Sequence, residues 1–177
     1  MYCYFKKIAN QYHIFTLFAG LTLYKILAMK NKILIAVDLS EQSNSIIQQG
    51  IAFAEKMDGV VVISFIIPVY VDYLQSQMAM IPTQWDEIYQ VQKQHAMDEL
   101  RAIQLKHPNT VVDLFVEVGN PKFDLIEKAN EINASYIVVG THGRTGLSHT
   151  VMGSTAEYIV RHATMPVLVI PMDRSTH

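Results

Sequence analysis

Glycine and hydroxyl side chains are concentrated in one segment near the carboxyl end of the chain, at a spacing that suits the binding of a phosphate group. Gly140, Gly143 and Gly146 lie close together, and Gly153 is followed directly by Ser154 and Thr155. Glycines allow the backbone to turn and to approach an anion closely. The first amides of a helix are unpaired donors at the positive end of its dipole. The segment therefore predicts a phosphate-binding loop.

The flanking residues predict the elements that would position this loop. Residues 136–139 form an apolar run typical of a buried strand, and residues 156–162 have helical periodicity. A strand, a glycine-rich loop and a helix then follow one another. The loop lacks the Gly-Lys-Ser/Thr ending of a P-loop. Because no P-loop lysine is present, fast ATP turnover is not expected.

Apolar runs and amphipathic stretches alternate along the rest of the chain. Strands are expected at residues 33–37, 60–67, 111–118, 136–139 and 166–170, and helices at residues 43–57, 85–106, 122–132 and 156–162. In the long helix 85–106, an apolar stripe is expected from Ile88, Val91, Met97, Leu100 and Ile103. This order predicts a single α/β domain of the Rossmann-like class, with a five-stranded parallel sheet covered by helices on both faces.

The carboxyl ends of the predicted strands bring separated residues to one edge of the sheet. Asp38, residues 65–68, residues 119–120 and Gly140 all follow strands. Ligands of such sheets bind outside these ends, where the strand order reverses. The phosphate loop is thus expected to share its site with Asp38 and Phe65.

Several polar residues admit two interpretations. Asp38 could hydrogen-bond a nucleoside or cap the following helix, where Ser40 or Ser43 could act instead; its position favours the ligand role. His142 and His149 flank the loop and are interpreted as solvated side chains. His95 and Glu99 lie one helical turn apart, yet no further metal ligand is identifiable. No catalytic residue and no metal site are assigned.

Composition narrows the classes of partner. The chain has 177 residues, a formal net charge of -2 and one cysteine, Cys3. The absence of a basic cluster beyond Lys6 and Lys7 argues against nucleic-acid binding. A single cysteine excludes an internal disulfide and fits a reducing, cytoplasmic setting.

The amino-terminal residues are treated separately. Residues 14–24 are apolar but too short for a membrane span, which needs roughly 20 residues. We predict that residues 1–29 form an N-terminal extension, either an upstream mis-start or a loosely attached segment. A membrane-associated tail is the alternative. The domain is expected at residues 30–172, and residues 173–177 form a tail.

Three linked motifs resemble those of universal stress proteins. Gly140, Gly143, Gly153 and Ser154 match the Gly-x2-Gly-x9-Gly-(Ser/Thr) motif of the family's ATP-binding branch. The opening run 33–40 and the closing run 160–170 agree with it, so the likeness extends from residue 30 to residue 171. The resemblance implies a fold related to the adenine nucleotide α-hydrolase-like domains, with strand order 3-2-1-4-5.

The resemblance also implies a ligand and the residues that hold it. ATP with Mg²⁺ would be bound, with Asp38 placed for hydrogen bonds to ribose or base, and Phe65 beside the adenine, where the family often has a smaller valine. The implied site residues are Ala36, Val37, Asp38, Phe65, Gly140, Thr141, Gly143, Arg144, Gly153, Ser154 and Thr155. The family also implies a homodimer through residues 167–170, and an apolar edge strand needs such cover.

The chain is accordingly expected to be a cytoplasmic, ATP-dependent stress-response module with an unknown protein partner and no membrane or nucleic-acid partner. The first alternative is a slow ATPase or a self-phosphorylating enzyme, with Ser154 or Thr155 as acceptor. The absence of an obvious general base argues against it. The second alternative is a dimeric scaffold that binds no nucleotide.

Overall fold

The computed structural model describes residues 30–69, 82–141 and 152–171. The predicted extension 1–29 and the tail 173–177 lie outside these ranges, as do the loop residues His142, Gly143 and Arg144. What the sequence predicts for them stays a prediction.

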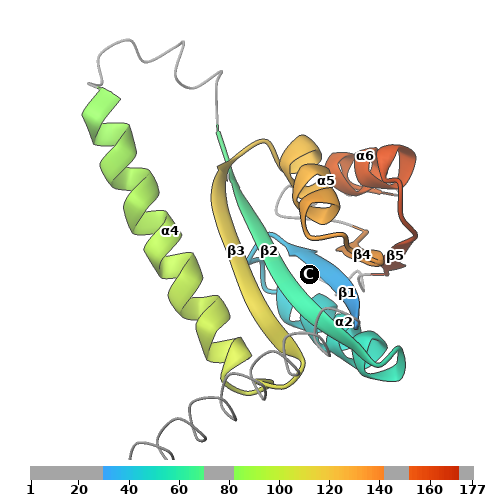
Figure 1. Ribbon diagram of the computed structural model, residues 1–177. Helices are drawn as coiled ribbons and strands as arrows, with labels where there is room; N and C mark the ends of the chain where they lie inside the picture. The colour runs from blue at the N-terminus through green and yellow to red at the C-terminus, as the bar shows by residue number, and fades with distance from the viewer. Residues whose placement is uncertain (1–29, 70–81, 142–151, 172–177) are drawn as a thin grey trace, which may run out of the picture. The chain divides into compact units, whose positions relative to one another are not determined.

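Strands and helices alternate as the sequence predicts. The elements are β1 (Asn31–Val37), α2 (Ser43–Lys56), β2 (Gly59–Pro68), α4 (Pro82–Gln104), β3 (Val111–Gly119), α5 (Pro121–Glu131), β4 (Tyr136–Gly140), α6 (Ser154–His162) and β5 (Val167–Ile170). The five strands are parallel and lie in the order β3-β2-β1-β4-β5 (Figure 1). The predicted single α/β domain and its strand order are confirmed.

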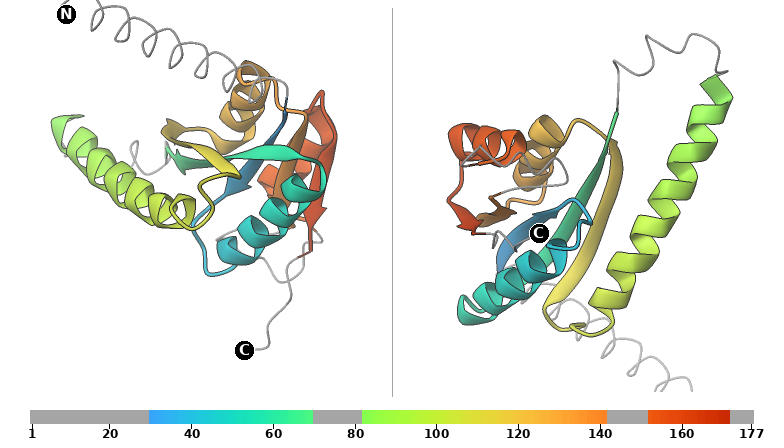
Figure 2. Two further views of the ribbon diagram at one scale, coloured as in Figure 1. Left: turned by 60° about the horizontal axis from the view of Figure 1, so that its bottom comes forward. Right: turned by 180° about the vertical axis from the view of Figure 1, so that it is seen from behind.

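Alternate residues of the central strand β1 point to opposite faces of the sheet. Ile33 and Ile35 pack into a core cluster with residues of α2 and α4, whereas Leu34 and Ala36 pack with residues of α5 and α6. In the left view of Figure 2, α2 and α4 lie below the sheet and α5 lies above it. Burial on both faces explains the continuous apolar run at residues 33–37 of β1.

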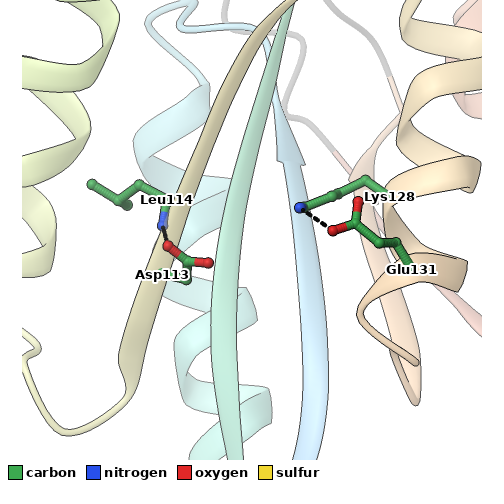
Figure 3. Close-up of polar contacts among 4 residues, drawn as sticks. All are labelled: Asp113, Leu114, Lys128 and Glu131. Carbon is green, nitrogen blue, oxygen red and sulfur yellow. Dashed lines mark hydrogen bonds and ion pairs between the residues drawn. The ribbon is translucent and has the colours of Figure 1, made fainter.

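The edge strand β3 carries an irregularity near its start. Val111 pairs with Val61, but Asp113 pairs with Val62, so the backbone of residue 112 is an extra residue in the ladder. The Asp113 side chain accepts a hydrogen bond from the amide of Leu114 at 2.8 Å (Figure 3). β-Bulges are over-represented at sheet edges, although they are rarer between parallel strands such as β2 and β3.

The buried face of α4 differs from the predicted stripe. Leu100 is fully buried, and Met97 and Ile103 pack against the core, as predicted. Val91 is 70% exposed and Ile88 is 39% exposed, so this part of the prediction is wrong. Helical spacing instead directs Ala96 and Tyr89 toward the sheet. Apolar residues at 88 and 91 lie off that face.

Within the three described ranges, none of the helices combines the length and the apolar character that crossing a membrane requires.

Candidate functional site

A cavity of about 320 Å³ opens at the carboxyl ends of the strands. Strand residues and the residues just after them line it on one side: Ala36, Val37, Asp38, Phe65, Ile66, Pro68, Val139 and Gly140. Helix residues complete the lining: Ile46, Asn120, Pro121, Lys122, Leu125, Gly153, Ser154, Thr155, Ala156 and Ile159. The volume lies within the range of small-molecule sites, roughly 300–1,000 Å³.

The strand ends form the apolar wall of the cavity. Val37 and Phe65 are paired in register and belong to the core cluster that includes α2 and α4. Ala36 and Ile66 belong to the cluster that includes α5 and α6. Phe65 lines the cavity but is only 5% exposed, so most of its ring is packed in the core.

Asp38 organises the loop between β1 and α2. Its Oδ1 accepts a hydrogen bond from the Ser40 amide at 3.0 Å and one from the Ser43 hydroxyl at 3.0 Å. The intervening Leu39 has a left-handed φ of 56°. The N-cap of α2 is Gln42, whose side chain makes no capping hydrogen bond. Asp38 therefore holds the loop and the first residue of the helix without capping the helix itself.

The first turn of α6 forms the polar wall on the β4 side. Gly153 is the N-cap residue, and its amide donates to the Thr141 carbonyl at 2.7 Å. The Thr141 amide in turn donates to the Ile170 carbonyl at 3.0 Å. This chain of bonds joins β4, the start of α6 and the end of β5. It leaves Ser154 and Thr155 in the cavity lining, at the positive end of the helix dipole.

The first turn of α5 forms a second polar wall. Asn120 is the N-cap, and its Oδ1 accepts from the Lys122 amide at 3.0 Å. The Asn120 amide donates to Asp124 Oδ2 at 2.9 Å, which closes the turn from the other side. A Cβ at Gly119 would collide with the Asp124 carboxylate, so a larger residue at position 119 would displace this side chain from the Asn120 amide.

Of the predicted site residues, eight line the cavity together: Ala36, Val37, Asp38, Phe65, Gly140, Gly153, Ser154 and Thr155. Thr141 lies next to Gly140 and takes part in the bonds described above. Gly143 and Arg144 fall outside the described residues. The prediction omitted Lys122, although residues 119–120 were expected at this edge. The sequence did contain a signal for Lys122. Pro121 follows Gly119 and Asn120 at the end of a predicted strand, and proline favours the first position of a helix, so the start of α5 could be expected at this edge.

Among the described residues, no group of three His, Cys, Asp or Glu side chains is arranged to hold a metal ion. Of the described residues that line the cavity, Asp38 is the one that carries a carboxylate.

Comparison with known proteins agrees with this architecture. A family model described as the universal stress protein family matches residues 29–171. Universal stress protein MJ0531 of Methanocaldococcus jannaschii is 29% identical over 155 residues, which cover 85% of this chain and 84% of that protein.

Solved structures share the fold. The universal stress protein UspA from Lactobacillus plantarum has a TM-score of 0.68 at 22% identity, covering 80% of this chain and 97% of its own. A universal stress protein in complex with cAMP has a TM-score of 0.53 at 18% identity, covering 80% and 96%.

The sheet order and the cavity at the strand ends define a single-domain α/β protein of the Rossmann-like class. The family match then identifies it further. The chain belongs to the universal stress protein family.

Proposed function

We propose that this chain is an ATP-binding regulatory module, whose conformation or partner binding responds to the bound nucleotide. One observation carries the proposal: a single cavity joins the apolar ends of β1 and β2 to the glycine and hydroxyl residues at the start of α6. An adenine base needs an apolar surface, and a phosphate group needs hydrogen-bond donors.

Two further points support a nucleotide as the ligand. A structural relative has been solved with cAMP, an adenine nucleotide. Gly153 to Thr155 also lie where helix amides and hydroxyls can donate to phosphate oxygens. We propose that residues Gly140 to Gly153, including Gly143 and Arg144, close around the phosphates of ATP.

Mg²⁺ is proposed to accompany ATP. This ion is usually held by one or two carboxylates together with substrate phosphates. Asp38 lines the cavity and supplies a carboxylate of that kind. The ion would neutralise phosphate charge, while the protein residues bind and orient the nucleotide.

Calorimetric titration with ATP, ADP and AMP tests the proposal, and Gly153→Val is the informative variant. Gly153 has φ -66° and ψ 151°, a conformation open to any residue, so the variant should fold. Because Gly153 lines the cavity next to the first amides of α6, we expect the isopropyl group of valine to reduce the space for a phosphate. We expect Gly153→Val to weaken ATP binding at least about tenfold, or ~1.4 kcal/mol.

Gly153→Ala is the matched control, because alanine and valine are both poor N-cap residues but differ in size. Its loss of affinity should be clearly smaller. No heat from any nucleotide with the unmodified protein would contradict the proposal and favour the scaffold alternative. Steady ADP release during long incubation would favour the enzyme alternative, with Ser154 or Thr155 tested as phosphate acceptor.

We also propose a cytoplasmic homodimer through Val167–Ile170. This strand lies at an edge of the sheet, contains no charged residue, and has three partly exposed apolar residues before Ile170. Pairing with a second copy would cover that edge. Sedimentation equilibrium should give twice the chain mass of 20.1 kDa. A mass that stays at one chain at high micromolar concentration would contradict the dimer.

A further inference from the structure

Lys122 is the feature of the cavity that the proposed function does not use. It is the second residue of α5, it lines the cavity, and it is only partly exposed. The same cavity is lined on another side by the first turn of α6. Lys122 therefore lines the same cavity as Ser154 and Thr155, and its flexible side chain carries a positive charge.

Other cations of the neighbouring helices are neutralised within the described residues. Lys128 of α5 pairs with Glu131 at 3.0 Å (Figure 3). It also lies over the Phe115 ring, 4.2 Å from the ring centroid. Arg161 of α6 pairs with Glu157 at 2.8 Å. Among the described residues, no carboxylate lies within ion-pair distance of Lys122.

The position of Lys122 on its helix is electrostatically unfavourable. The amino terminus of a helix carries partial positive charge, which a cation in the first turn opposes. Asp124 lies in the same turn, but its Oδ2 accepts from the Asn120 amide, and residues two apart on a helix do not face each other. An anion in the cavity would relieve this repulsion.

The capped turn also limits where the lysine can go. The Asn120 side chain accepts a hydrogen bond from the Lys122 amide, and the Asp124 side chain accepts one from the Asn120 amide. These two bonds hold the backbone of residues 120–122 in place. A fixed backbone reduces the conformational freedom that would be lost when Lys122 Nζ meets a ligand.

We propose that Lys122 contacts a phosphate group of the bound nucleotide and makes the cavity selective for nucleotides over nucleosides. The inference rests on the proposed function, because it takes an adenine nucleotide as the ligand. In this proposal, α5 contributes to phosphate binding through Lys122. The glycine motif by itself predicts phosphate contacts only from the loop before α6 and the start of that helix.

Calorimetric titration of adenosine, AMP and ATP into the full chain tests this role in the unmodified protein, Lys122→Met and Lys122→Arg. Methionine keeps the length and helix propensity of lysine without its charge. We expect Lys122→Met to weaken AMP and ATP binding about tenfold, since charge-assisted hydrogen bonds to phosphate are strong. Adenosine binding should stay unchanged, and Lys122→Arg should retain most of the nucleotide affinity.

The control is Lys106→Met, which removes an exposed lysine that does not line the cavity. It should leave all affinities unchanged. Unaltered nucleotide binding by Lys122→Met, or an equal loss for adenosine and ATP, would overturn the role of Lys122 while leaving ATP binding intact. Failure of the unmodified protein to bind any nucleotide would overturn the proposed function and this inference together.

Discussion

Ile35→Ala is expected to lower the free energy of unfolding by about 2–5 kcal/mol, the range for removing a large aliphatic side chain from a packed core. Ile35 is fully buried in the middle of β1. This strand lies at the centre of the sheet, between β2 and β4. Few neighbours can therefore move to fill the space that the shorter side chain leaves.

The residue that faces Ile35 makes a loss in the upper part of this range the expected result. Gly50 of α2 lies so close to Ile35 that a Cβ at position 50 would collide with its Cδ1 and approach its Cγ1 to 3.0 Å. Since a glycine has no side chain to rearrange, the gap left by Ile35→Ala would stay largely open. Cavities that cannot collapse give the larger losses of stability.

Urea denaturation followed by circular dichroism measures this change. The control is Val91→Ala on α4, where the side chain is 70% exposed and the expected change lies within about 0.5 kcal/mol. An unchanged m-value would show that the variant alters stability and not the extent of unfolding. A loss below about 1 kcal/mol would contradict the packing described here.

The sequence predicted the sheet well because its strands are buried on both faces. Residues 33–37 are apolar throughout and residues 60–67 are apolar except for Ser64, and few other structures suit short β-branched runs of this kind. The strand order came from the resemblance to a family, since alternation of strands and helices does not by itself specify which strands are neighbours.

The sequence was less informative for α4 and for the direction of Phe65. In α4, apolar residues at 88 and 91 suggested a stripe, yet packing against β3 selected the face of Tyr89, Ala96 and Leu100. Phe65 could be placed at a strand end, but the face to which it points depends on the register with Val37. Both features are decided by tertiary contacts.

Tertiary contacts also explain why only part of the candidate site was predicted from the sequence. The glycine motif and Asp38 follow strands directly, so the topology alone brings them to one edge. Lys122 lies inside a helix turn, where a lysine is common on any solvated face. Its relation to the cavity depends on how α5 lies across the sheet, which the sequence pattern does not specify.

Substitutions of Asp38 are expected to separate its structural role from its proposed ligand role. Asp38→Ala should lower the free energy of unfolding by about 1–3 kcal/mol, because the Ser40 amide and the Ser43 hydroxyl lose their acceptor. Ser43 is 4% exposed, so water replaces that bond poorly. Asp38→Asn keeps an oxygen at the Oδ1 position and should lose less than half as much stability.

The effect of Asp38→Asn on ATP affinity should be larger than its effect on stability. Hydrogen bonds from ribose hydroxyls or from ligated Mg²⁺ waters are stronger to a carboxylate than to a neutral amide. We therefore expect Asp38→Asn to weaken ATP binding about tenfold while it remains nearly as stable as the unmodified protein. Asp113→Asn is the matched control, since Asp113 also accepts a backbone hydrogen bond but lies on the edge strand β3, outside the cavity lining.

The comparison of the two Asp38 variants decides between the interpretations. If Asp38→Asn binds ATP as tightly as the unmodified protein, the aspartate only shapes the loop between β1 and α2, and the cavity recognises the nucleotide through its other residues. If binding weakens while the unfolding free energy is retained, the carboxylate charge itself takes part in recognition. Denaturation and calorimetry on the same preparations measure both quantities, so a loss of fold cannot be mistaken for a loss of contact.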